Sequence, residues 1–244
     1  MSRNERTELL LGKEALQILA GKHVAVFGLG GVGSYAVEAL ARTGVGRLTL
    51  IDCDQYAESN LNRQLFATER TVGQSKTAAA KERISLVAPD CRVDTVDLFY
   101  TPENADTVDL TAFDAVVDAI DTVSSKIHLI CAAEEAGVPL ISSMGTGNKL
   151  DPTKLRVTDL YKTQGCPLAR VLRRELKKRG IARLKVVYSE EEPKKTVLTD
   201  EEHGRHAPGS AVFVPACAGM ILAAETVRDL IRKSDGYDTN KKHL

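Results

Sequence analysis

Four glycines in one short stretch could cradle a phosphate: Gly28, Gly30, Gly31 and Gly33, in the pattern G-x-G-G-x-G. An apolar run precedes them at 24–27, and a helical pattern follows at 32–42. Glycine suits such a turn because the backbone must approach the phosphate closely, at a helix N-terminus whose free amide groups attract anions. The motif indicates a nucleotide, but by itself it does not separate NAD, FAD and ATP.

Two carboxylates follow predicted strands. Asp52 ends the run 47–52, about twenty residues after the glycines, where a doubly wound fold places the acid that binds ribose. Asp121 directly follows the run 115–119 and suits magnesium, since Mg²⁺ takes one or two carboxylates together with phosphate oxygens. The structural alternative for both residues is a helix cap.

Cationic and amide side chains stand between these two acids. Arg63 and Lys76 suit the oxygens of a triphosphate, Arg through paired hydrogen bonds and Lys as a point charge. Asn60 can donate to phosphate or to ribose. A hydride-transfer enzyme needs no such set beside a diphosphate, so the residues favour adenylation, in which a carboxylate attacks the α-phosphate of ATP. Positioning and neutralisation of charge provide most of that catalysis.

The elements that must position these residues alternate between strand and helix. We predict strands at 24–27, 47–52, 92–98, 115–119 and 138–142, with helices at 32–42, about 76–87 and 124–136. Such alternation implies a parallel sheet covered on both faces, with ligands at the carboxyl ends of the strands. The predicted fold class is therefore α/β, a doubly wound Rossmann-like sheet, and Gly28, Asp52 and Asp121 should line one crevice.

The second half of the chain changes character. We predict further strands at 151–160 and 183–188, and helices at 7–20, 167–178 and 212–232. The stretch 189–209 is polar and rich in Pro and Gly, which predicts a mobile loop, and the tail 235–244 is expected to fray. The helix at 167–178 is strongly basic, with Glu175 as its one acid.

Bulk composition limits the function classes. The chain has 244 residues, 43% of them apolar, and a formal net charge of zero, so binding to nucleic acid requires a local patch. There is no signal-like segment, and the longest apolar run, 210–224, is too short to span a bilayer, which favours a cytoplasmic protein without membrane contact. Five cysteines without a C-x-x-C argue against a disulfide framework and a tetrathiolate zinc site.

The motifs together resemble the E1-like adenylating superfamily, which includes ubiquitin-activating enzymes and bacterial activators of sulfur-carrier proteins. The matching segments are 28–33, Asp52-x-Asp54, Ser59-Asn60-Leu61-Asn62-Arg63-Gln64, 73–76 and Asp118-Ala119-Ile120-Asp121. The resemblance implies one domain over 1–244, with a nucleotide-binding core at about 20–145 and a substrate-facing part at about 150–235. It also implies ATP and Mg²⁺ as cofactors.

The same resemblance implies roles for particular residues. It assigns nucleotide contacts to Gly28, Gly30, Gly31, Gly33, Asp52, Asp54, Asn60, Arg63, Gln64, Lys76, Asp121 and Thr122. It assigns catalysis to Arg63, Lys76, Asp121 and Arg6, with the metal at Asp121. It further implies a homodimer in which Arg6 crosses into the partner's site.

The C-terminal half resembles one branch of this superfamily, the tRNA threonylcarbamoyladenosine dehydratases. The resemblance rests on Tyr161-Lys162-Thr163, the segment 166–181, Val187-Tyr188-Ser189-Glu190-Glu191 and the motifs at 208–210 and 213–215. It implies that the threonyl carboxylate at A37 of an ANN-decoding tRNA is adenylated, and that the side chain then closes to its cyclic form, leaving AMP and pyrophosphate. It implies tRNA binding by Arg170, Arg173, Arg174, Lys177, Lys178 and Arg179. It leaves open a structural monovalent cation and a cysteine desulfurase partner.

Three other interpretations stay open: an adenylyltransferase for a ubiquitin-like sulfur carrier, an NAD-dependent oxidoreductase, and a noncatalytic nucleotide sensor. The first is disfavoured because sulfur-carrier activators typically carry paired C-x-x-C zinc ligands, and this chain has none. Ring closure is intramolecular once the carboxylate is activated, so no cysteine nucleophile is required.

The remaining cysteines and histidines have structural and functional interpretations. Cys166 precedes a helix start, where the dipole can lower a thiol pKa, yet we expect no nucleophile there. Cys217 is expected to be a buried apolar residue, and Cys53 to lie near the ligand without reacting. For His203 and His206, substrate contact from the loop 199–210 is favoured over metal binding.

Overall fold

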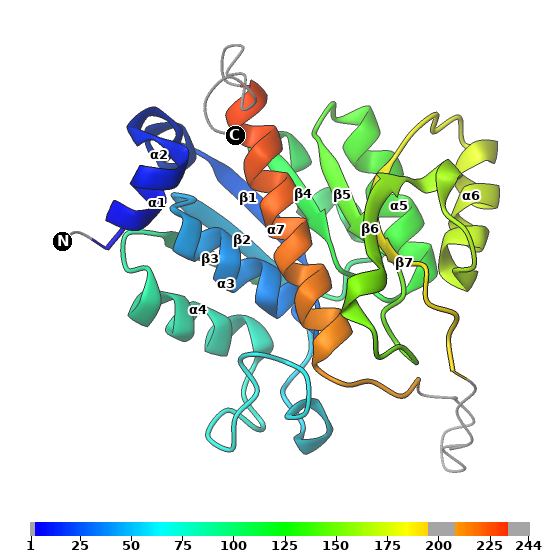
Figure 1. The fold of residues 1–244 in the computed structure, drawn as a ribbon, viewed down its shortest axis with the longest axis horizontal. Coiled ribbons are helices and arrows are strands. Elements are labelled where there is room, and N and C mark those ends of the chain that lie inside the picture. The colour runs from blue at the N-terminus through cyan, green and yellow to red at the C-terminus, as the bar shows by residue number, and fades with distance from the viewer. Residues whose placement is uncertain (1–2, 195–207, 234–244) are drawn as a thin grey trace.

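The computed structural model describes residues 3–194 and 208–233 and contains a seven-stranded sheet in the order β3-β2-β1-β4-β5-β7-β6 (Figure 1). The strands are β1 (His23–Phe27), β2 (Arg47–Asp52), β3 (Arg92–Asp97), β4 (Ala115–Asp118), β5 (Leu140–Ser143), β6 (Leu155–Asp159) and β7 (Lys185–Ser189). All neighbours pair in parallel except β6, which runs antiparallel to β7 at one edge. The predicted α/β sheet, parallel through the first half of the chain, is confirmed.

Helices cover both faces of this sheet. They are α1 (Glu5–Leu11), α2 (Lys13–Ala20), α3 (Gly33–Thr43), α4 (Lys76–Val87), α5 (Val123–Glu135), α6 (Pro167–Lys178) and α7 (Phe213–Lys233). Because strand side chains alternate between faces, Val24 and Val26 pack with α2, α3, α4 and α7, whereas Ala25 and Phe27 pack with α5. α6 packs on α5 and β7 in a separate apolar cluster. No helix in the described ranges is long and apolar enough to cross a membrane.

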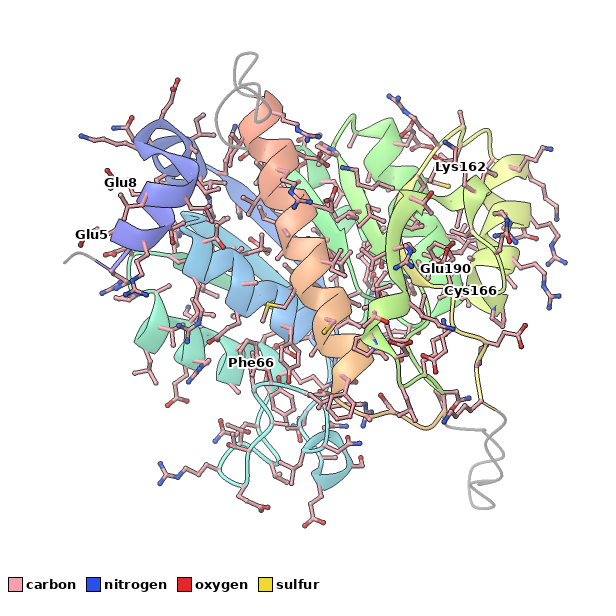
Figure 2. All side chains as sticks on the ribbon, viewed as in Figure 1. Glu5, Glu8, Phe66, Lys162, Cys166 and Glu190 are labelled. Carbon is pink, nitrogen blue, oxygen red and sulfur yellow. The ribbon has the colours of Figure 1, made fainter. Side chains whose placement is uncertain are left out.

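The N-terminal helix predicted at 7–20 is interrupted. Gly12 has a φ of 87° and a ψ of 155°, a conformation that residues with a Cβ avoid, and the chain turns there between α1 and α2. α1 lies at the edge of the molecule, where Figure 2 labels Glu5 and Glu8, and none of its residues is buried. The single helix was therefore a wrong prediction, and Gly12 is the physical reason.

The strand predicted at 151–160 is shorter than expected. Its first residues form a 3₁₀ turn, Pro152–Lys154, in which Asp151 accepts a hydrogen bond from the Thr153 amide at 2.9 Å. Proline has no amide hydrogen, so at the first position of such a turn it leaves no donor without a partner. Pro152 therefore favours the turn over an extended strand at these residues. β6 then begins at Leu155. Of the predicted loop 189–209 and tail 235–244, residues 195–207 and the entire tail lie outside the described residues.

The sheet reverses its order between β1 and β4. From β1 the chain proceeds outward through β2 and β3, and it then returns to place β4 on the other side of β1. The connections that leave β1 and β4 therefore diverge, which creates a crevice at the carboxyl ends of these strands. The glycine turn lies in this crevice, directly against the chain that leaves β4.

Two of the glycines are required by the closeness of that contact. Gly28 has a φ of 87°, and a Cβ there would lie 2.6 Å from the carbonyl oxygen of Ala119. A Cβ on Gly33 would lie 1.7 Å from the carbonyl oxygen of Gly28. Any side chain at either position would therefore push the turn away from β4 and open the crevice.

A buried ion pair supports the floor of the same region. Asp118, at the end of β4, accepts hydrogen bonds from Lys126 Nζ at 2.7 Å and from Ser142 Oγ at 2.6 Å. Both charged side chains have no solvent exposure. The pair joins β4, α5 and β5 beneath the segment that carries Asp121.

Candidate active site

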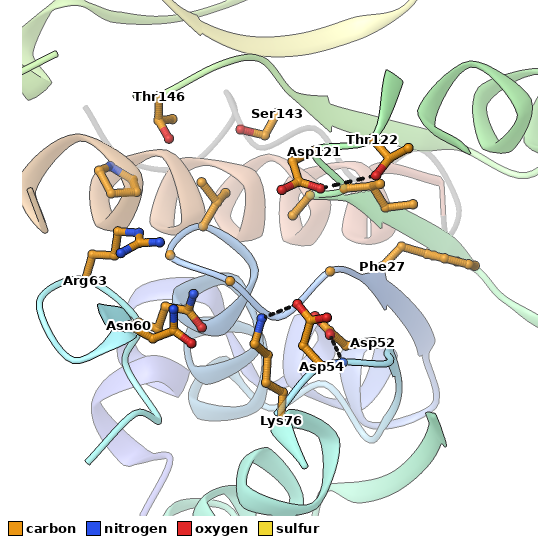
Figure 3. Close-up of a pocket in the computed structure, with 18 of the residues that line it drawn as sticks. Phe27, Asp52, Asp54, Asn60, Arg63, Lys76, Asp121, Thr122, Ser143 and Thr146 are labelled. Carbon is orange, nitrogen blue, oxygen red and sulfur yellow. Dashed lines mark hydrogen bonds and ion pairs between the residues drawn. The ribbon is translucent and has the colours of Figure 1, made fainter. Parts of the chain in front are cut away.

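A cavity of about 660 Å³ opens at the carboxyl ends of the strands (Figure 3). Its walls include the glycine turn, the ends of β1, β2 and β5, and the segment after β4. It brings together most of the predicted nucleotide set: Gly28, Gly30, Gly31, Asp52, Asp54, Asn60, Arg63, Gln64, Lys76, Asp121 and Thr122. Gly33 is not in the wall, because it begins α3 and packs against Gly28.

Arg6 is the predicted catalytic residue that the chain does not bring to this cavity. It is exposed on α1 and is absent from the cavity wall. Leu9 and Leu10 on the same helix are also highly exposed, at 83% and 82%. A role for Arg6 in the cavity would therefore require a second copy of the chain.

Asp52 fixes the glycine turn to the end of β2. Its carboxylate accepts the Leu29 amide at 2.7 Å and the Asp54 amide at 2.8 Å. Each carboxylate oxygen has a second lone pair, so the side chain can still accept hydrogen bonds from two hydroxyl groups. This arrangement fits the ribose role and assigns Asp52 a structural role as well.

Lys76 is held at the first position of α4 by its neighbours. Lys76 is only 6% exposed, and its Nζ lies 2.8 Å from Asp54 Oδ2. Burial acts to raise the pKa of Asp54, but the hydrogen bond and charge of Lys76 outweigh it and lower the pKa. The ion pair is therefore formed at neutral pH, and the ammonium group retains two further donors for an anion.

Asp97, which the sequence did not single out, supports Lys76 from below. Its carboxylate accepts hydrogen bonds from the hydroxyl groups of Ser75, at 3.1 Å, and of Thr77. These two residues flank Lys76, so the start of α4 is fixed on both sides. The sequence could have indicated this support, because Asp97 ends the strand β3 and the hydroxyl residues Ser75 and Thr77 flank Lys76.

The loop between β2 and α4 packs against the glycine turn. Arg63 Nη1 donates to the Ser59 carbonyl at 2.7 Å, and a Cβ on Gly31 would lie 3.4 Å from Arg63 Cγ. Asn60 Oδ1 accepts the Ala57 amide at 3.1 Å, which leaves its amide nitrogen for other acceptors. Gln64 is 6% exposed, and its Oε1 has no hydrogen-bond partner within the described structure. A buried acceptor without a partner in a cavity wall indicates that a ligand or water completes it.

Asp121 offers an exposed carboxylate for a metal ion. That carboxylate receives a long hydrogen bond of 3.5 Å from Thr122 Oγ1. In the described part of the chain, the only three potential ligands close enough to share one ion are Asp52, Cys53 and Asp54. Two of those three are already engaged by backbone amides or by Lys76. The site therefore fits Mg²⁺ at Asp121, completed by phosphate oxygens and water.

The opposite wall of the cavity consists of residues that were not among the predicted site residues. Figure 3 shows Ser143 and Thr146 across the cavity from Asp54 and Lys76. Further members of this wall are Met144, Gly145, Gly147, Pro208, Ser210 and, from α6, Leu168. Ser143 ends β5 just as Asp52 ends β2. Its place at the carboxyl end of a predicted strand could therefore have marked it as a cavity residue.

Comparison with protein-family models decides the relationship of the chain. The model of the ThiF family matches residues 1–243. The chain belongs to the ThiF family. It is 44% identical over 238 residues to the tRNA threonylcarbamoyladenosine dehydratase of Bacillus subtilis, covering 93% of this chain and 94% of that protein.

Solved structures of the ThiF family agree with this similarity. The Escherichia coli tRNA N6-threonylcarbamoyladenosine dehydratase in complex with AMP superposes with a TM-score of 0.86 at 37% identity, covering 94% of both chains. Its complex with ATP gives a TM-score of 0.84 at 37% identity, over 97% of this chain and 96% of that one. The Escherichia coli molybdopterin-synthase adenylyltransferase is more distant, with 37% identity over 137 residues, 54% of this chain and 51% of that protein. The resemblance to tRNA dehydratases is confirmed.

Outside the cavity, the predicted basic helix is confirmed as α6, but its cations are not equivalent. Arg173 donates to the Thr163 carbonyl at 2.9 Å and to the Thr163 hydroxyl, so its guanidinium is used within the fold. Glu175 forms ion pairs with three of the others, Arg174, Lys178 and Arg179. All of the predicted cations except Arg173 are exposed.

This charge cluster predicts a pH dependence of stability. Hydrogen bonds from Lys178, Arg179 and Arg174 lower the pKa of Glu175 from 4.5 to about 2. A carboxyl with a lowered pKa in the folded state stabilises the fold above its unfolded-state pKa, and that contribution is lost as the pH falls from 4.5 to about 2. Over this pH interval, we expect the Tm of Glu175→Gln to fall less than the Tm of the unsubstituted protein. Thermal melts followed by circular dichroism measure both values. Glu134→Gln, an exposed position on α5, is the control, and an unchanged acid profile for Glu175→Gln would contradict the expectation.

The cysteines match their expectations only in part. Cys53 lines the cavity, and burial and Asp54 raise the pKa of its thiol, which does not favour a nucleophile. Cys166 is buried in the apolar cluster beneath α6. Cys217 was predicted to be buried, but it is half-buried, packed against the main core. His203 and His206 lie outside the described residues.

Proposed function

We propose that this protein dehydrates N6-threonylcarbamoyladenosine at position 37 of ANN-decoding tRNA in an ATP-dependent reaction. The threonyl carboxylate is adenylated, the side chain then closes to the cyclic form, and AMP and pyrophosphate are released. One observation carries the proposal: a single cavity combines the glycine turn, Lys76, Arg63 and Asp121 in a chain similar over nearly its full length to proteins with this activity in their names. The corresponding location is the cytoplasm, where tRNA is modified.

The cavity fits ATP by its shape and donor set. Gly28, Gly30 and Gly31 line the cavity without side chains to cover their amides, which allows phosphates close to the backbone. Asp52 accepts the ribose hydroxyls, and Arg63 and Lys76 neutralise phosphate oxygens. The remaining contacts come from Gly30, Gly31, Asp54, Asn60, Gln64 and Thr122.

The reaction needs little covalent participation from the protein. A carboxylate oxygen of the substrate attacks the α-phosphorus, the bond to the bridging oxygen breaks, and pyrophosphate leaves with the charge that Lys76 and Arg63 neutralise. The carbamoyl group of the same side chain then attacks the acyl carbon and loses one proton as AMP leaves, which is favoured because the step is intramolecular. Asp121 would hold Mg²⁺, which supplies Lewis-acid stabilisation of phosphate oxygens. A monovalent cation and a cysteine desulfurase partner stay hypotheses that rest on family resemblance.

A homodimer would complete the cavity with Arg6 from the partner. The support is the exposure of Arg6, Leu9 and Leu10 on a helix without a buried residue, because adjacent leucines this exposed are commonly covered by a partner surface. Arg6→Ala and Lys76→Met protein should each be inactive, whereas a mixture that exchanges subunits should recover about a quarter of full activity per total site. Absence of recovery in a mixture shown to form heterodimers would contradict this arrangement.

The exposed cations of α6 are the proposed tRNA surface. We expect Arg170→Gln with Lys177→Gln to weaken tRNA binding and to lower the slope of log affinity against log salt by about 2, since each lost phosphate contact removes about 0.9. The matched control is Lys81→Gln with Arg232→Gln, exposed cations on α4 and α7. Filter binding across a salt series measures both quantities. Equal slopes for the two double variants would place the tRNA elsewhere.

Nucleoside mass spectrometry tests the function directly. Threonylcarbamoylated tRNA is incubated with the protein, ATP and Mg²⁺, with Asp121→Ala as the control. We expect the modified nucleoside to lose one water with the unsubstituted protein and none with the variant. Unchanged tRNA, together with ATP–pyrophosphate exchange that depends on a carrier protein ending in Gly-Gly, would instead support a sulfur-carrier adenylyltransferase.

A further inference from the structure

The turn between β5 and β6 contains an unusual backbone conformation. Among the described residues other than glycine, Asn148 alone has a positive φ, 60°. The left-handed region disfavours residues with a Cβ, and asparagine is among the few that tolerate it. A non-glycine residue in this region often marks a place where the backbone direction matters.

The backbone of Asn148 bonds to two stretches that lie far from it in the sequence. Its amide donates to the carbonyl of Gly209 at 2.7 Å, and its carbonyl accepts the amide of Lys194, also at 2.7 Å. The adjacent Lys149 is 3% exposed, and its Nζ donates to the Ser189 carbonyl at 3.2 Å. The turn is therefore fixed to the end of β7 and acts as a firm base for both hydrogen bonds.

These contacts determine the position of one part of the cavity wall. Gly147, Pro208 and Ser210 all line the cavity. A Cβ on Gly147 would lie 2.8 Å from Pro208 Cβ, so turn and wall are in direct contact. From the other side, Asn62 Nδ2 donates to the Ser210 carbonyl at 2.9 Å. The stretch 208–210 is thus held between the turn and the loop that carries Arg63.

The wall held in this way faces the proposed nucleotide groups. Thr146, next to Gly147, lies across the cavity from Asp54 and Lys76 (Figure 3). In phosphoryl transfer the attacking and leaving oxygens lie roughly in line. If the phosphates lie along the glycine turn and Lys76, the attacking carboxylate approaches from the wall that Thr146, Gly147 and Ser210 provide.

We infer that Asn148 is a positioning residue for the acyl substrate: its left-handed backbone fixes the wall at Gly147, Pro208 and Ser210 against which the substrate carboxylate is placed. This inference rests on the proposed adenylation, because it concerns the second substrate of the same cavity. The backbone conformation is the essential property, and glycine should therefore replace asparagine without loss.

Three substitutions separate the backbone role from ordinary structural support. Asn148→Ala disfavours the left-handed conformation, and we expect it to raise the KM for tRNA about fivefold to tenfold. Asn148→Gly retains the conformation and should stay within about twofold of the unsubstituted protein. Gly137→Ala is the matched control, because Gly137 has a φ of 68°, has open space around its missing Cβ and is not in the cavity wall. It should lower thermal stability about as much as Asn148→Ala and leave the KM unchanged.

Further readouts distinguish the inference from the function on which it rests. The dissociation constant for ATP should be unchanged in Asn148→Ala, since the nucleotide contacts lie on the other wall. Gly147→Ala, which presses on Pro208, should reproduce the rise in KM. Hydrogen exchange should be faster at the amides of position 148 and of Lys194 in Asn148→Ala, but not in Asn148→Gly.

Clear results would overturn the inference. They are an unchanged KM in Asn148→Ala, equal defects in Asn148→Ala and Asn148→Gly, or a KM rise in Gly137→Ala of the same size. Unsubstituted protein that does not dehydrate the tRNA would instead overturn the proposed function, and the exchange experiment would still decide whether the backbone of Asn148 holds the wall.

Discussion

Lys76→Met is expected to lower the rate of adenylate formation by about 10²- to 10³-fold, the usual effect of removing one preorganised electrostatic group. Methionine retains the length of the side chain and removes the charge. The ammonium group is fixed by Asp54 and by the start of α4, so no other cation can easily take its place. Single-turnover release of pyrophosphate in the presence of tRNA and ATP measures the rate.

Lys81→Met provides the control for this prediction. It makes the same chemical change on the same helix, at an exposed position outside the cavity wall. Loss of Lys76 leaves Asp54 without its partner, but that side chain is 61% exposed, so water can solvate it and the fold should persist. A folded Lys76→Met variant with a rate within about threefold of the unsubstituted protein would remove Lys76 from the proposed mechanism.

Lys126→Met is expected to have the largest effect on stability, about 3–5 kcal/mol of the free energy of unfolding. Asp118 and Lys126 are both fully buried, and removal of the lysine leaves a carboxylate without its counter-charge inside the protein. The expected fall in Tm is about 6–20 °C for a chain of this size. Urea unfolding followed by circular dichroism measures the loss.

A double variant and a surface ion pair test whether the cost of Lys126→Met comes from the burial of the ion pair or from the loss of a charge alone. Asp118→Asn combined with Lys126→Met removes both charges, and we expect it to recover part of the lost stability. Arg3→Met breaks the Arg3–Asp90 pair, in which the side chains are 50% and 90% exposed, and should cost less than about 1 kcal/mol. Equal losses for Lys126→Met and Arg3→Met would show that burial does not determine the cost.

The elements around the cavity could be predicted because their signals are local. The boundaries of α6 were predicted correctly, since Pro167 starts the helix and Gly180, with a φ of 78°, follows its end. The glycine turn and Asp52 have a fixed spacing along the chain, which the doubly wound fold requires. Their convergence in one cavity then follows from the parallel arrangement of β1, β2 and β4.

Other features depend on contacts between distant segments, and the sequence did not reveal them. Arg173 could not be separated from the other cations of its helix, because its bond to Thr163 depends on how the preceding loop folds back. The wall at Pro208 and Ser210 depends on Asn148 and Asn62, which are far away in the chain. The break at Gly12 was missed because glycine is often tolerated inside a helix, and only its φ decides the outcome.

The position of α6 between surface and cavity has a thermodynamic consequence. One end of this helix contributes Leu168 to the cavity wall, while its outer face presents the exposed cations. Ligands on the two sides of one rigid helix are coupled when the affinity of each depends on the position of the helix, and such coupling is reciprocal. If tRNA binds the outer face as we propose, whatever factor it contributes to the affinity for nucleotide, the nucleotide must contribute to the affinity for tRNA. The helix would then let the enzyme retain ATP selectively when its RNA substrate is in place.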